Sequence, residues 1–187
     1  MLRSVRLLFA ILAVHALVLS SAAAARTDVV VDAVGDVPAT APTYVDIIQA
    51  QVTDQVGADV LFFHMALAGP APTVPSGFVA WNWAIDIGGA PGPEYLVVVR
   101  WCTQAMVTDC GPGPAHWESA LIAGAGVTLN AFPFEVNGAT VKAYLDPALI
   151  GDPAGFNWRA IARLFPGPTG FPPTDLAPDT GGSTFTR

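Results

Sequence analysis

The sequence predicts an all-β fold, a two-sheet antiparallel sandwich of the immunoglobulin-like or jelly-roll-like kind. Short segments that are apolar, or that alternate between apolar and polar residues, recur along most of the chain. Many of the 18 glycines and 17 prolines lie between these segments, where turns are expected. No internal repeat, charge block or linker divides the chain. Residues 26–187 are therefore expected to form one domain, with a partly irregular tail over 166–187.

The first 25 residues have the three parts of a cleavable signal peptide. Arg3 and Arg6 precede an apolar run from Leu7 to Leu19, and small residues fill 20–25. The apolar run has 13 residues, whereas a helix that spans a bilayer needs about 20. We therefore expect a secreted, periplasmic or extracellular protein that has no stable membrane insertion once the signal is cleaved.

The charge balance narrows the classes of partner. Eight Lys and Arg stand against fifteen Asp and Glu, and removal of Arg3 and Arg6 with the signal leaves a net charge of −9. Such a surface repels nucleic acid and anionic lipid, so no nucleic-acid partner is expected. It is compatible with binding to cations, sugars or proteins. The alternative is that the negative charge serves only to keep the protein soluble.

The first half of the domain is expected to contain five strands. Strict alternation in 44–53 places Ile47 on the face opposite Ala50 and Val52. The segment 59–68 is apolar almost throughout, which predicts a strand buried on both faces. The five expected strands are 29–34, 44–53, 59–68, 78–87 and 94–102.

The second half continues in the same style. Residues 147–150 are expected to form one helical turn that Gly151 closes. Alternation in 156–165 favours a strand, although a helix would also gather Trp158, Ile161 and Phe165 on one side. The expected strands here are 116–122, 127–132, 139–145, 156–165 and 183–186.

Cys102 and Cys110 are the two cysteines of the chain. An even number of cysteines in an exported protein favours a disulfide over a metal pair, and free thiols are the alternative. The polar segment 103–109 between them is expected to be a loop tip.

Acidic residues at strand ends, many of them beside glycine or proline, suggest a calcium site. Calcium takes six to eight oxygen ligands, which loops at one end of a sandwich can supply together. The alternative is that each Asp caps its own turn. The candidate metal ligands are Asp32, Asp36, Asp46, Asp86, Glu94, Asp175 and Asp179.

Trp81 and Trp83 lie two residues apart on one strand, so both side chains project from the same face. Paired aromatic rings suit a sugar-binding platform, but a stripe shared with Val79 and Ile85 also suits a core. His64 and Met65 point to opposite faces of their strand and cannot ligate one haem iron together, so no haem is expected. His116 and Glu118 alone do not define a metal or acid–base site.

Several short motifs give the chain a resemblance to exported bacterial β-sandwich domains. They are D-A-V-G-D at 32–36, V-D-I at 45–47, W-A-I-D-I at 83–87, P-E-Y-L-V-V-V at 93–99, V-K-A-Y-L-D-P-A-L-I-G at 141–151, F-N-W-R-A-I-A at 156–162 and D-L-A-P-D at 175–179. With these motifs the chain resembles the DOMON domains and the family-nine carbohydrate-binding modules. The resemblance implies binding of a sugar, with structural calcium, and no enzymatic activity.

These observations favour a secreted, non-catalytic binding or accessory domain, with carbohydrate or an extracellular surface component as its partner. No serine, histidine and acid occur at the spacing of a hydrolase motif. One alternative is a secreted hydrolase that uses Asp86 and Glu94 as paired carboxylates. Another is an extracellular structural or surface protein without a small ligand.

Overall fold

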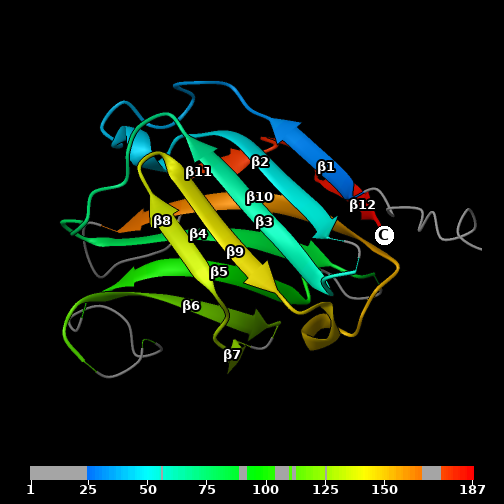
Figure 1. Cartoon of the computed structure of the whole chain (residues 1–187). Helices are drawn as coiled ribbons and strands as arrows, with labels where there is room; N and C mark the ends of the chain where they lie inside the picture. The colour runs from blue at the N-terminus through cyan, green and yellow to red at the C-terminus, as the bar shows by residue number, and fades with distance from the viewer. Residues whose placement is uncertain are drawn as a thin grey trace, which may run out of the picture.

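A computed structural model describes residues 25–55, 57–88, 92–103, 110, 113–124, 126–165 and 174–187. These residues form the predicted sandwich of two antiparallel sheets, packed face to face (Figure 1). Residues 1–24 of the expected signal peptide, most of the 103–109 loop and the 166–173 stretch lie outside the described part. Within that part, no helix has the length and apolar character that crossing a membrane requires.

Sheet A has five strands in the spatial order β1-β2-β3-β9-β8. Hairpins join β1 to β2 and β2 to β3, and β8 to β9. The bounds are Arg26–Val31 for β1, Ile47–Gln55 for β2, Val60–Leu67 for β3, Thr140–Leu145 for β9 and Phe134–Asn137 for β8.

Sheet B has seven strands, six of them in the order β11-β10-β4-β5-β6-β7, and β12 also pairs with β10. The long β10 therefore carries β4 along one edge and both β11 and β12 along the other. The bounds are Asp175–Ala177 for β11, Gly155–Phe165 for β10, Phe78–Asp86 for β4, Tyr95–Cys102 for β5, His116–Ala123 for β6, Val127–Asn130 for β7 and Ser183–Thr186 for β12.

The main core fills the space between the two sheets. Strand alternation sends every second side chain inward, so one face of each strand is apolar. Trp81, Trp83 and Phe63 are fully buried there, and Trp158 is almost so. Phe63 and Trp83, from opposite sheets, lie with ring centroids 5.5 Å apart. A smaller buried cluster on the outer face of sheet B contains Phe78, Ala80, Val98 and Ala120.

Two expectations about strand faces are wrong. The β2–β3 pairing has an irregularity between Ile47 and Gln49, and this extra residue resets the alternation, so that Ile47, Ala50 and Val52 are all buried in one core. Strand β3 is buried on one face only, because Val60, Phe62, His64 and Ala66 are partly exposed on the outside of sheet A.

The strand at 156–165 is confirmed as β10, and the short β8 and β11 are additional to those expected. The turn at Pro147–Ile150 is a 3₁₀ helix (η2), and a second one, η1, spans Thr43–Val45. The Asp146 carboxylate accepts the Ala148 N–H at 2.9 Å to start η2. Gly151 closes it at φ 82°, a conformation that glycine adopts without strain.

A carboxylate fastens the two sheets where β1 lies against β12 (Figure 1). Asp28 of β1 accepts hydrogen bonds from Trp158 Nε1 at 2.7 Å and from the Ser183 hydroxyl at 2.6 Å. The Trp158 indole is buried, so this carboxylate is what satisfies its N–H. Nearby, Arg187 pairs with Asp54 and Asp152 and holds the C-terminus to sheet A.

We expect Asp28→Ala to lower the free energy of unfolding by about 2–3 kcal/mol, because the indole N–H is left buried without an acceptor. Urea unfolding followed by tryptophan fluorescence measures this loss. Asp28→Asn keeps an acceptor oxygen and should lose less. An unchanged unfolding midpoint in Asp28→Ala contradicts the role given to this bridge.

Candidate functional site

Five aspartates gather where the edge of sheet B meets the beginning of β2. We refer to this group as the acidic centre. Two of its members lie in the loop that follows β1, one precedes β2, one begins β11 and one follows β11. The pairing of β11 with β10 and its contact with β2 bring residues that are about 130 positions apart together. The acidic centre comprises Asp32, Asp36, Asp46, Asp175 and Asp179.

The five carboxylates form two overlapping groups that share Asp36. Asp32, Asp36 and Asp179 make one group, and Asp36, Asp46 and Asp175 make the other. Within each group, carboxylate oxygens lie within 4.8 Å of one another. Asp46 and Asp175 are buried, Asp32 is partly buried, and Asp36 and Asp179 are exposed, so the centre runs from the interior to the surface.

Asp46 holds the deepest carboxylate of the acidic centre, because its residue is only 3% exposed. Its Oδ2 accepts the N–H of Gly35 at 2.9 Å. Gly35 adopts φ 84°, so this turn of the loop suits glycine and fixes the direction of that N–H. The other oxygen, Oδ1, is buried and has no hydrogen-bond partner among the described residues. A charged oxygen buried without a partner is costly, so it calls for a ligand.

Asp175 links the two sheets directly. Its Oδ2 accepts the N–H of Ile47 in β2, and its Oδ1 accepts the N–H of Leu176 at 2.8 Å. Both hydrogen bonds fix the carboxylate in place at the seam between sheets A and B. Since each carboxylate oxygen has two lone pairs, the bonded oxygens can still accept a cation.

The electrostatics of the acidic centre disfavour full ionisation without a counterion. Burial raises the pKa of Asp32 to about 6, and neighbouring carboxylates add to the rise. Burial likewise raises the pKa of Asp175 to about 6, with Asp36 and Asp46 adding repulsion against its backbone hydrogen bonds. A bound divalent cation would remove both the repulsion and the need for protonation.

The donor set of the acidic centre fits calcium. All five side chains offer oxygen, the ligand atom that Ca²⁺ prefers, and the loops can add backbone carbonyls and water. The buried, unpartnered Asp46 Oδ1 is the atom that most needs such an ion. Five of the seven ligands expected from the sequence therefore lie together.

Asp86 and Glu94 do not belong to the acidic centre. Asp86 pairs with Asn157, whereas Asp175 pairs with Ala162, five residues or about 17 Å further along β10. Both acids serve the β4–β5 hairpin instead. Glu94 Oε2 accepts the Ile87 N–H at 2.8 Å, and Asp86 Oδ1 accepts the Gly88 N–H at 2.9 Å. Among the described residues, neither acid is grouped with the other expected metal ligands, so their role as ligands stays a prediction.

Asp86 also lines a small cleft at this end of sheet B. The cleft has a volume of about 330 Å³, and Asn157 and Arg159 are among its polar walls. Asn157 Oδ1 accepts the Thr184 hydroxyl at 2.8 Å, which commits part of this wall to the β10–β12 pairing.

Trp81 and Trp83 do not form a sugar platform, because both are fully buried in the main core. Trp81 stacks on Trp117 with ring centroids 5.3 Å apart, and its Nε1 donates to the carbonyl of Tyr44 at 3.1 Å. Trp81 and Trp83 share this strand face with Val79 and Ile85, and the whole face is buried in the main core. Core packing was the alternative to a sugar platform.

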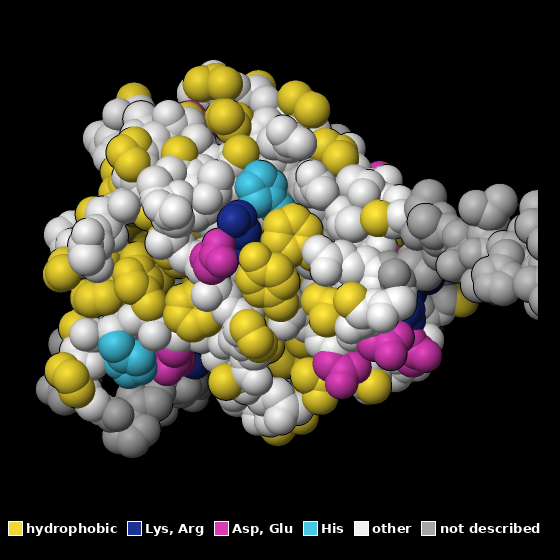
Figure 2. Space-filling view, viewed as in Figure 1, with side chains coloured by type: hydrophobic (Ala, Val, Ile, Leu, Met, Phe, Trp, Pro, Cys, Tyr) yellow, Lys and Arg dark blue, Asp and Glu magenta, His cyan; other side chains and the backbone are white. Residues whose placement is uncertain are grey.

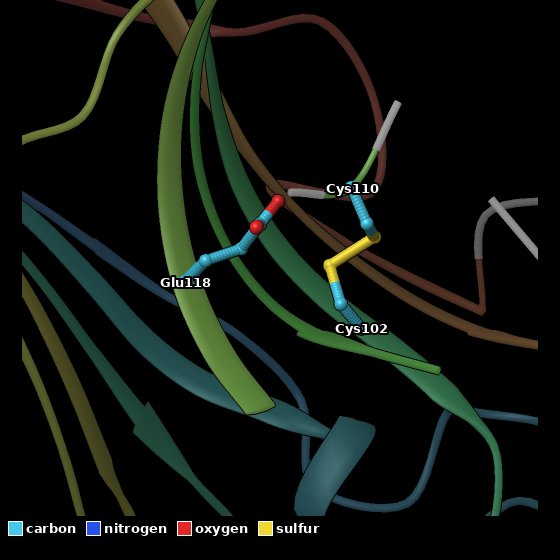
Figure 3. Close-up of side chains that lie close together, drawn as sticks. All are labelled: Cys102, Cys110 and Glu118. Atoms are coloured by element: carbon cyan, nitrogen blue, oxygen red, sulfur yellow. A yellow bond between two sulfur atoms is a disulfide. The ribbon is translucent and has the colours of Figure 1, made fainter. Parts of the chain in front are cut away.

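The predicted disulfide joins Cys102 and Cys110 with a Cα–Cα distance of 5.9 Å, and Glu118 of the neighbouring β6 lies beside it (Figure 3). Sulfurs bonded to each other are not thiolates, so this trio is not a metal site. Glu118 is instead paired with the buried Arg100 at 2.6 Å, and His116 Nε2 lies 3.2 Å from its other oxygen. His116 and Glu118 thus contribute, with Arg100, to a hydrogen-bonded network on sheet B.

Comparison with known proteins adds no relative. The chain matches no protein-family model, and neither the curated proteins nor the solved structures gave a match. The resemblance to DOMON domains and family-nine carbohydrate-binding modules therefore stays a prediction. The assignment of function depends on the geometry of the site alone.

We expect the calcium-free protein to become more stable as the pH falls from 7 to 5. The folded pKa of about 6 for Asp32 and Asp175 lies above their ordinary value of 3.8, so the folded state binds protons more tightly in this range. Urea unfolding after removal of calcium with a chelator measures the change. The double variant Asp32→Asn/Asp175→Asn should flatten it. A calcium-free protein that loses stability over the same range contradicts this description of the centre.

Proposed function

We propose that this protein is a secreted, non-catalytic binding domain whose sandwich is completed by calcium bound at the acidic centre. The observation that carries the proposal is Asp46 Oδ1, a buried carboxylate oxygen without a hydrogen-bond partner among the described residues. It lies in a group with Asp36 and Asp175 whose carboxylate oxygens are within 4.8 Å of one another. A divalent cation supplies the missing partner and offsets the repulsion among the carboxylates.

Calcium at this position would have a structural effect. Asp36 and Asp46 lie in the connection between β1 and β2 of sheet A, while Asp175 begins β11 of sheet B and Asp179 follows it. An ion held by Asp36, Asp46 and Asp175 would tie the edges of the two sheets together. Its role would therefore be to order the loops at this end of the sandwich.

The proposed location outside the cytoplasm has two supports. The first 25 residues have the pattern of a signal peptide. The disulfide between Cys102 and Cys110 is of a kind that persists in oxidising compartments. Extracellular modules commonly bind calcium with dissociation constants of about 10⁻⁴–10⁻³ M, which suits a site with exposed members such as Asp36 and Asp179.

The hydrolase alternative gains no separate support. Asp86 and Glu94, its proposed pair, each accept a backbone N–H of the β4–β5 hairpin. These contacts account for both carboxylates as parts of a turn.

We expect added calcium to raise the melting temperature by about 5–10 °C relative to EDTA, because ligand at about 100 times Kd contributes about 2.7 kcal/mol. Differential scanning calorimetry of the purified protein measures the shift. A midpoint that is the same in EDTA and in calcium at about 0.1 M, which is 100 times the weaker dissociation constant expected, contradicts the proposal.

We expect Asp46→Asn to abolish that calcium response while leaving the calcium-free protein at least as stable as the wild type. The amide oxygen can still accept the Gly35 N–H, but one negative charge of the acidic centre is lost. Asp59→Asn is the matched control, because Asp59 is exposed in the β2–β3 turn at φ 48°, which asparagine tolerates. If Asp46→Asn shows the full calcium response in the same calorimetry, Asp46 is not a calcium ligand.

A further inference from the structure

Opposite charges line the small cleft on sheet B without pairing with each other. Asp86 of β4 and Arg159 of β10 both belong to its walls. Strand pairing sets Ala84 beside Arg159 and Asp86 beside Asn157, which makes Asp86 and Arg159 diagonal neighbours. Diagonal neighbours on one face of a sheet have Cα atoms about 7–8 Å apart. Among the residues that the structure describes, Arg159 forms no ion pair with Asp86 or with any other acid.

The cleft lies on the outer face of sheet B. Ile85 and Trp158 belong to the main core, so alternation turns the residues on either side of each of them outward. Gly92 before β5 and Gly181 between β11 and β12 also line the cleft, and neither has a side chain that could fill it. A volume of about 330 Å³ lies near the lower end of the range for ligand pockets, about 300–1,000 Å³, so the cleft suits a small ligand.

Arg159 keeps its positive charge available although acids outnumber bases in this chain. Arg100 and Arg187 are each paired with a carboxylate. On the outer face of sheet A, Lys142 pairs with Glu135 at 2.8 Å, and Figure 2 shows a basic side chain next to an acidic one at the centre of that face. An arginine in a cleft without an acid paired to it can take the anionic group of a ligand.

Asp86 has one carboxylate oxygen left for a ligand. Its Oδ1 accepts the Gly88 N–H at 2.9 Å, whereas its Oδ2 has no hydrogen-bond partner among the described residues. Asn157 uses its Oδ1 to accept the Thr184 hydroxyl, which leaves the donor group Nδ2. The cleft therefore combines a guanidinium, a carboxylate oxygen and an amide donor.

We propose that this cleft binds a free α-amino acid, whose carboxylate lies against Arg159 and whose ammonium group lies against Asp86. The two charged groups of an α-amino acid are attached to one carbon, so the molecule can bridge two side chains that are diagonal neighbours. The Arg159 guanidinium can donate two parallel hydrogen bonds to the carboxylate, and Asp86 Oδ2 can accept one from the ammonium group. A ligand with a single charge would leave one of these two side chains without a partner.

This inference rests on the proposed binding function and names a ligand class for it. The cleft is separate from the acidic centre, because Asn157 lies five residues along β10 from Ala162, the residue that pairs with Asp175. The alternative is that Asp86 and Arg159 are solvated surface charges without a ligand. A binding measurement with amino acids that lack one of the two charges distinguishes the roles.

The test is a titration of the isotope-labelled protein, in calcium, with each of the common L-amino acids, followed by NMR. We expect at least one amino acid to shift the amide resonances of Gly92, Gly181 and Gly182 until they saturate. The N-acetyl derivative of that amino acid lacks the ammonium group, and its carboxamide derivative lacks the carboxylate. Each derivative should bind at least about tenfold more weakly, because it loses one charge-assisted contact.

Arg159→Gln and Asp86→Asn each remove one charge from the cleft, and each should weaken binding at least about tenfold. The asparagine oxygen can still accept the Gly88 N–H, and the NMR spectrum of each variant reports whether it is folded. Lys142→Gln and Asp59→Asn are the matched controls, because they remove the same charges from residues outside the cleft. Their affinities should equal that of the wild type.

Three results overturn the inference: no amino acid gives saturable shifts, the single-charge derivatives bind as tightly as the amino acid, or both cleft variants keep the wild-type affinity. The outcome is independent of the calcium melt. If an amino acid binds while calcium leaves the melting temperature unchanged, the ligand site is confirmed and the calcium site is wrong. If calcium stabilises the protein and no amino acid binds, the ligand site alone is wrong.

Discussion

Repulsion among five carboxylates at the seam between the sheets is the constraint on which this end of the structure depends. Asp175 and Asp46 are held inside it by backbone N–H donors, so neither can turn toward water without losing a hydrogen bond. Burial and mutual repulsion raise the pKa of Asp32 and Asp175 to about 6. The fold thus concentrates carboxylates where the two sheets also have to meet, and the proposed cation would offset the repulsion among them.

The rest of the sandwich explains why the seam stays in place. The main core packs Phe63 of sheet A against Trp83 of sheet B, so the sheets cannot slide without opening a cavity. Asp28 adds a polar connection through Trp158 and Ser183 further along the same edge. The acidic centre is therefore a local feature at one end of a scaffold that already has a dense core.

Alternation predicted the long strands well, because inward and outward residues differ clearly in β4 and β10. It could not predict β8 and β11, which have only four and three residues and too little pattern. It also misassigned Ile47, because one inserted residue in β2 resets the face without leaving a mark in the composition. In β3 the reason is different: the sequence is apolar on both faces, so the pattern could not show that Phe62 points outward.

The candidate site, too, could be predicted from the sequence only in part. Aspartate at a strand end or in a loop that contains glycine or proline identified all five members of the acidic centre, yet Asp86 and Glu94 carry the same local signature and serve a hairpin. The difference lies in which loops reach the same edge, which depends on the pairing of β11 with β10 and its contact with β2. That information is not local, so residue type and neighbours alone could not supply it.

The measurement that tests the central claim most directly is hydrogen–deuterium exchange of the native protein with and without calcium. If an ion ties the two sheet edges together, amides in 32–36, 46–47 and 174–179 should gain protection together, with the Gly35 and Ile47 N–H groups among them. Amides of the β6–β7 hairpin, on the far edge of sheet B, should exchange at unchanged rates. Equal exchange of all these segments with and without calcium would contradict the account, because the acidic centre would then hold no ion.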